Sequence, residues 1–142
     1  MIWNLTKKKI VARRPICALS FITRARGMIA RDFREFDAMV FPNCKAIHTM
    51  FMTKRIDVIF VDAENRVCEI RKRLSPWLPI VKSRSAVTVV EMPSGAIESS
   101  GTEIGDILDL NSEICNPDAI LKKGIERQVS PEIVLPYKDS IK

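Results

Sequence analysis

Short runs of β-forming residues recur about every ten residues through the middle of this chain. The clearest lies at residues 56–62, is bounded by charges, and is followed by an alternating apolar and polar run at residues 67–71. Similar runs lie at residues 36–41, 86–92 and 107–110. Because turn residues separate these runs and no repeated strand–helix alternation occurs, the sequence predicts a mainly β fold, either a compact, antiparallel-rich sandwich or a partly open barrel.

Two short helices are expected outside these strands. Ser20 offers an N-cap for a helix near residues 20–30, and Pro117 is suited to the first position of a second helix. A length of 142 residues favours one domain over two. We therefore expect a single mainly β domain over residues 1–110, followed by a C-terminal extension over residues 111–142 that contains a short helix and an extended tail.

Charge is distributed unevenly along the chain. Residues 1–82 hold 17 Lys/Arg against seven Asp/Glu, whereas residues 83–142 hold six against ten. A basic half can attract phosphate groups, nucleic acid or an anionic membrane surface. The acidic C-terminal part can equally pack beside the basic part and neutralise it. Aromatic residues are few, and most lie inside apolar patterns, which disfavours nucleic acid as a partner.

The cysteines and the apolar runs bear on the compartment. No N-terminal secretory pattern is visible, and no apolar run approaches the length of a membrane span. The four cysteines, at positions 17, 44, 68 and 115, show no C-x-x-C pairing. We therefore expect four reduced thiols and a cytoplasmic location.

Motifs that would define a reaction are missing from the sequence. It holds no G-x-S-x-G, no P-loop, no dinucleotide fingerprint and no H-E-x-x-H. Cys44-x-x-x-His48 is half of a possible zinc site, but His48 is the only histidine and a closed site needs four ligands. We expect no metal and no cofactor, and the sequence leaves open whether the protein is an enzyme.

Several polar residues lie where they could form a ligand site. Asp57 and Glu91 border β-rich runs, where a buried carboxylate needs arginine, histidine or backbone donors. We expect at least one of the two to be partly buried and paired with an arginine. His48 is expected to line the functional surface. Asp106 follows Gly105 and is most simply a turn residue. The candidate ligand-binding residues are Arg26, Arg31, His48, Thr49, Asp57, Glu91, Ser94 and Asp106.

The same residues occur within an ordered series of sequence blocks between residues 10 and 110. The blocks are Arg24-x-Arg26-Gly27-Met28-x-x-Arg31, Ala38-Met39-Val40-Phe41, Ile47-His48-Thr49-Met50-Phe51-Met52, the strand at 56–62, Val90-Glu91-Met92-Pro93-Ser94-Gly95 and Ile104-Gly105-Asp106. This order resembles the family catalogued as domain of unknown function 192. The resemblance implies a compact, mostly β domain with one short helix near residues 20–30, and it implies no reaction.

The chain departs from that family's pattern in its most distinctive block. His48-Thr49-Met50-Phe51 stands where the family commonly has Trp-Met-Lys-Asn, and Arg55 stands at the usual proline. The chain therefore resembles a divergent branch of the family.

Three functions are compatible with these observations. The leading hypothesis is a non-catalytic binding module that recognises a small polar, carbohydrate-like or peptide ligand in a polar cleft. The second is a small hydrolase or isomerase with Asp57 or Glu91 as general base and His48 assisting. The third is an anion or nucleic-acid binder that uses the basic first 82 residues.

Overall fold

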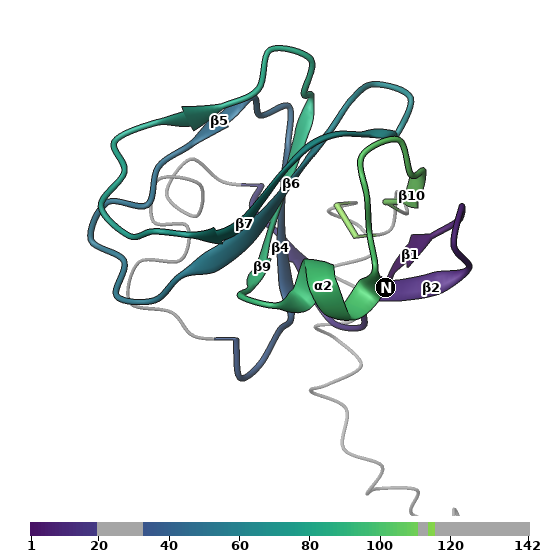
Figure 1. Ribbon diagram of the computed structural model, residues 1–142, viewed down its shortest axis with the longest axis horizontal. Coiled ribbons are helices and arrows are strands. Elements are labelled where there is room, and N and C mark those ends of the chain that lie inside the picture. The colour runs from purple at the N-terminus through teal and green to yellow at the C-terminus, as the bar shows by residue number, and fades with distance from the viewer. Residues whose placement is uncertain (20–32, 111–113, 116–142) are drawn as a thin grey trace, which may run out of the picture.

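The computed structural model describes residues 1–19, 33–110 and 114–115, and most of these residues form or connect short strands (Figure 1). The mainly β fold class is confirmed, while both expected helices lie outside the described residues. The elements are β1 (Ile2–Asn4), β2 (Lys9–Ala12), β3 (Pro15–Cys17), β4 (Ala38–Pro42), β5 (Ala46–Ile47), β6 (Ile56–Val61), β7 (Val67–Leu74), β8 (Val81–Lys82), β9 (Thr88–Pro93), α2 (Ala96–Ser100) and β10 (Leu108–Asp109).

A five-stranded sheet forms the centre of the described structure. Its strand order is β3-β4-β9-β6-β7, and every neighbouring pair is antiparallel except β3 and β4. A three-stranded sheet, β10-β1-β2, and a two-stranded sheet, β5-β8, flank it. In Figure 1, β5 lies to the left of the central strands, and β1, β2 and β10 lie to the right. Within the described ranges no sheet closes into a barrel.

Each face of the central sheet covers its own hydrophobic core. Because side chains alternate along a strand, Val58 and Phe60 of β6 enter one core, and Ile59 and Val61 enter the other. The first core also contains Ile47 of β5, and we call this side of the sheet the arm face. The second core also contains residues of β1, β2, β10 and α2, and we call this side the hairpin face. Burial on both sides explains why β6 is continuously apolar at residues 58–61.

The short helix α2 is absent from the sequence-based expectations. The Pro93-Ser94-Gly95 segment ends β9 and leads directly into the helix. Gly95 at the N-cap has φ +95° and Gly101 at the C-cap has φ +66°, values that favour glycine. No side chain from the N-cap residue caps α2. That role falls to a carboxylate from another strand.

Two of the four cysteines form a disulfide, so the expectation of four reduced thiols is wrong. Cys17 at the end of β3 is bonded to Cys115, with their Cα atoms 5.3 Å apart and a sequence separation of 98. Cys44 and Cys68 are free thiols. The sequence could not indicate this pairing, because only the path of the chain returns residue 115 to the edge strand β3.

Candidate functional site

Asp57 is buried on the hairpin face and acts as a structural acceptor. Its Oδ2 accepts hydrogen bonds from the backbone N–H groups of Gly95 and Ile97, both at 3.0 Å, and its Oδ1 accepts one from Arg73 N at 2.9 Å. The first two cap the start of α2, whose N–H groups have no partner within the helix. Arg73 belongs to a bulge in β7, where two residues oppose one of β6. The predicted burial of Asp57 is confirmed, and its partners in the described residues are backbone amides.

Glu91 is buried on the opposite, arm face, in the middle of β9. Only 2% of it is exposed, and its cross-strand neighbours are Met39 and Val58, both in the arm-face core. Burial raises the pKa of the Glu91 carboxyl from 4.5 to about 8. Its Oε2 has no hydrogen-bond partner among the described residues. Burial therefore favours the neutral, protonated form of the Glu91 carboxyl.

The two carboxyl groups cannot act on one ligand from these positions. Asp57 pairs across the sheet with Met92, the neighbour of Glu91 on β9, and successive residues of a strand face opposite sides. A general acid and base pair requires both groups within hydrogen-bond reach of the same reacting atoms. The central sheet separates them instead.

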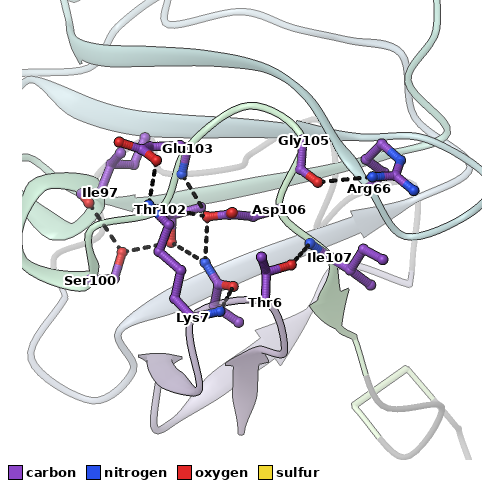
Figure 2. Close-up of polar contacts among 11 residues, drawn as sticks. Thr6, Lys7, Arg66, Ile97, Ser100, Thr102, Glu103, Gly105, Asp106 and Ile107 are labelled. Carbon is purple, nitrogen blue, oxygen red and sulfur yellow. Dashed lines mark hydrogen bonds and ion pairs between the residues drawn. The ribbon is translucent and has the colours of Figure 1, made fainter.

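Asp106 anchors the N-terminal hairpin to the loop before β10 (Figure 2). Its Oδ2 accepts hydrogen bonds from Asn4 Nδ2 at 2.7 Å and Glu103 N at 2.9 Å. Lys7 Nζ lies 3.9 Å from the same oxygen and also pairs with Glu103. Asn4 Nδ2 reaches Thr102 Oγ1 at 3.4 Å. The described neighbours satisfy this buried network, which assigns Asp106 the role of a turn and anchoring residue.

Thr49 also has a structural role, at the base of two loops. Its Oγ1 donates to Ser75 O at 2.7 Å and accepts from Leu78 N at 2.9 Å. Its backbone N–H donates to Leu78 O at 2.9 Å, and its carbonyl accepts from Trp77 N at 2.8 Å. Buried Thr49 therefore fixes the loop after β5 against the loop after β7.

The remaining candidates are dispersed. His48 is half-buried beside Thr49, and its Nδ1 is buried with no hydrogen-bond partner among the described residues. Ser94 is exposed in the turn before α2. Arg26 and Arg31, the expected partners of the carboxylates, lie outside the described residues. The role of His48 at a functional surface stays a prediction.

The loops fixed by Thr49 carry a feature that the sequence analysis missed. Phe51 is 60% exposed and Trp77 is 58% exposed, and their rings meet edge to face with centroids 5.2 Å apart and planes at 65°. Both have positive φ, +63° and +67°, which is unusual for bulky residues and costs about 1–3 kcal/mol each. Bulky residues in this conformation persist only when the surrounding structure holds them, and such positions cluster at functional sites.

These loops and the β5-β8 sheet form a basic projection, which we call the arm (residues 44–55 and 75–86). The arm contains five Lys/Arg, one histidine and no Asp or Glu. All five cations are exposed, and none forms a salt bridge with the carboxylates of the described chain. The five are Lys45, Lys54, Arg55, Lys82 and Arg84. The absence of Asp and Glu from both segments can be seen in the sequence. It indicates a shared basic surface only because the structure brings the two segments together.

Neither a metal cluster nor a membrane-spanning helix occurs among the described residues. The described residues contain no group of three or more His, Cys, Asp or Glu side chains arranged to hold a metal ion. None of the helices in the described ranges is long and apolar enough to cross a membrane.

The fold and these sites define a class of protein. It is a mainly β protein in which no described sheet closes into a barrel and most buried carboxylates stabilise the fold. Residues 5–110 match the family described as Uncharacterized ACR, domain of unknown function 192, and the chain belongs to this family. A UPF0127 protein of Thermococcus sibiricus is 35% identical over 119 residues, covering 80% of this chain and 76% of that protein. A UPF0127 protein of Pyrococcus furiosus is 35% identical over 116 residues, covering 78% and 98%.

A solved structure shares the fold. A protein of unknown function from Novosphingobium aromaticivorans aligns with a TM-score of 0.59 and 20% identity, over 67% of this chain and 73% of that one. At this identity the likeness concerns the fold alone. The family resemblance expected from the sequence is confirmed, and it assigns no activity.

Proposed function

We propose that this protein is a non-catalytic binding module that recognises an anionic ligand through the arm. The observation that carries the proposal is the exposed Phe51–Trp77 pair on two segments that hold five Lys/Arg and no Asp or Glu. Exposed apolar surface rimmed by charge commonly marks an interaction site. A positive surface potential favours anions and speeds their association.

The arm supports an anion better than the neutral polar ligand first expected. Carbohydrate-like recognition in a polar cleft would have used Asp57 and Glu91 together, but these side chains face opposite sides of the sheet. The enzyme alternative needs Asp57 or Glu91 to act with His48. Asp57 lies on the face opposite the arm, and Glu91, although on the arm face, is only 2% exposed. Asp57 already accepts three backbone hydrogen bonds.

Heparin, a flexible polyanion, tests this function directly. We expect binding at 50 mM salt that weakens steeply at 200 mM, as counterion release requires. The double variant Lys54→Gln, Lys82→Gln removes two arm charges and should lower heparin affinity by at least about tenfold. The logarithm of the binding constant should also fall less steeply with the logarithm of the salt concentration, with a slope shallower by about two. The matched control, Lys9→Gln with Arg13→Gln, removes the same charge from exposed positions at β2. No binding, or equal losses in both pairs, would contradict the proposal.

The cytoplasmic location is part of this proposal and has its own test. Disulfides are rare in the cytosol of most organisms, with intracellular proteins of hyperthermophiles as the main exception. Blocking free thiols in intact cells and then measuring the oxidation of Cys17 and Cys115 determines whether this disulfide is formed in the compartment where the protein resides.

A further inference from the structure

The arm combines two chemical features on one pair of segments. One is flat aromatic surface, from Phe51 and Trp77, and the other is exposed positive charge that makes no salt bridge within the described residues. The polyanions that present planar groups beside a negatively charged backbone are nucleic acids. The low aromatic content of the sequence disfavoured this partner, but what matters is where the few aromatic residues lie.

We propose that the arm binds single-stranded nucleic acid, with Trp77 and Phe51 stacking on unpaired bases and the arm's cations contacting phosphates. This inference rests on the proposed function, because it names the anionic ligand of the same surface. Side chains at the tip of a loop cannot reach the faces of bases in a duplex, whereas unpaired bases expose both faces. Stacking accepts every base, so little sequence preference is expected.

The arm is preorganised for stacking. Thr49 connects the two aromatic loops through its hydroxyl and its backbone, and Arg55 Nη1 donates to Arg73 O at 3.0 Å and to Ser75 Oγ at 2.8 Å. The two rings also hold each other at a fixed angle. Surface that is already ordered loses less conformational entropy on binding.

An anionic membrane is the alternative partner for aromatic residues beside cations. Insertion between lipid headgroups needs apolar side chains but no particular ring geometry. Stacking needs ring faces in fixed positions, and the hydrogen-bonded loops with left-handed backbone at both aromatics provide these. The observations therefore favour the nucleic acid, and vesicles serve as a test of the alternative.

The test uses the intact chain with Trp3→Phe, which leaves Trp77 as the only tryptophan. Trp77 fluorescence is titrated with a twelve-nucleotide oligo-dT strand, a duplex of equal length, heparin, and vesicles of phosphatidylglycerol and phosphatidylcholine. We expect quenching by oligo-dT and an affinity for it at least about tenfold above that for the duplex.

The aromatic variants are designed so that the fold survives. Trp77→Gly and Phe51→Gly suit the positive φ at these exposed positions, so neither introduces backbone strain. Trp77→Gly should lower affinity for labelled oligo-dT by about five- to 150-fold and leave heparin affinity unchanged. Chemical denaturation of each variant verifies that it is folded. Exposed Trp3→Phe, at β1 on the other side of the sheet, should change neither affinity.

The outcomes separate this inference from the proposed function. Equal affinity for oligo-dT, duplex and heparin, or unchanged oligo-dT affinity in Trp77→Gly, would overturn the inference and leave an anion-binding arm. Binding to the anionic vesicles alone would replace nucleic acid with a membrane. Failure to bind any of the four probes would refute both.

Discussion

The carboxylate of Asp57 in β6 accepts a hydrogen bond from the backbone N–H of Ile97, forty residues later in the chain, at 3.0 Å. The same oxygen accepts from Gly95, so a strand residue provides the cap that α2 lacks from its own sequence. The other oxygen accepts a hydrogen bond from Arg73 N in the bulge of β7. One buried side chain therefore connects three elements.

Removing this carboxylate should destabilise the fold. Asp57→Ala leaves three partly or fully buried N–H donors without an acceptor, and we expect a loss of about 2–4 kcal/mol in the free energy of unfolding. Asp57→Asn retains one carbonyl oxygen and should lose less. Glu64→Ala, an exposed turn position, is the control. Chemical denaturation measures the change, and wild-type stability of Asp57→Ala would exclude the capping role.

Glu91 should make stability depend on pH. Its pKa is about 8 in the folded state against 4.5 normally, so between these values the folded state keeps a proton that the unfolded state has lost. Stability contributed by the neutral carboxyl is therefore complete below about pH 4.5 and falls by about 1.4 kcal/mol per pH unit up to about pH 8. Glu91→Gln removes this titration. Its stability relative to the wild type should rise from pH 5 to 8 in denaturation experiments, and a constant difference would contradict the raised pKa.

The buried network around Asp106 should matter more than the exposed ion pair beside it. Asp106→Ala removes the acceptor of Asn4 Nδ2 and Glu103 N, and we expect a loss of about 2–4 kcal/mol. Glu103→Ala removes only its exposed ion pair with Lys7 and should cost less than about 1 kcal/mol. Thermal and chemical denaturation compare the two variants. Equal losses would mean that the network does not anchor the hairpin.

Reduction of the disulfide should lower the melting temperature. The bond joins residues separated by 98 positions in sequence, and such a constraint on the unfolded chain stabilises the folded state by about 2–5 kcal/mol. Cys17→Ser should reproduce the effect of a reductant, and the reductant should then have no further effect. Cys44→Ser, which changes a free thiol, is the control.

A truncated chain ending at residue 110 tests the predicted domain boundary in the same assay. It lacks Cys115 and should match Cys17→Ser in stability if residues 1–110 fold as one domain. A truncated chain that fails to fold would place the domain boundary further along the sequence.

The sequence by itself determined the main strands of the central sheet and the family. The continuous apolar run in β6 could only be a strand buried on both faces or a buried helix, and its length, β-branched residues and flanking turns favoured the strand. The Gly105-Asp106 turn was also readable, since turn chemistry is local. The burial of at least one of Asp57 and Glu91 followed from their places beside apolar runs.

Only the tertiary structure decided what those polar residues do. Asp57 and Glu91 border similar runs, yet strand register sends one to the cap of α2 and the other into the arm-face core. Cys17 meets Cys115, and Phe51 meets Trp77, across separations that no local pattern records. Local propensity and periodicity act over a few residues, whereas these contacts depend on how distant segments pack, and packing is fixed only once the whole chain has folded.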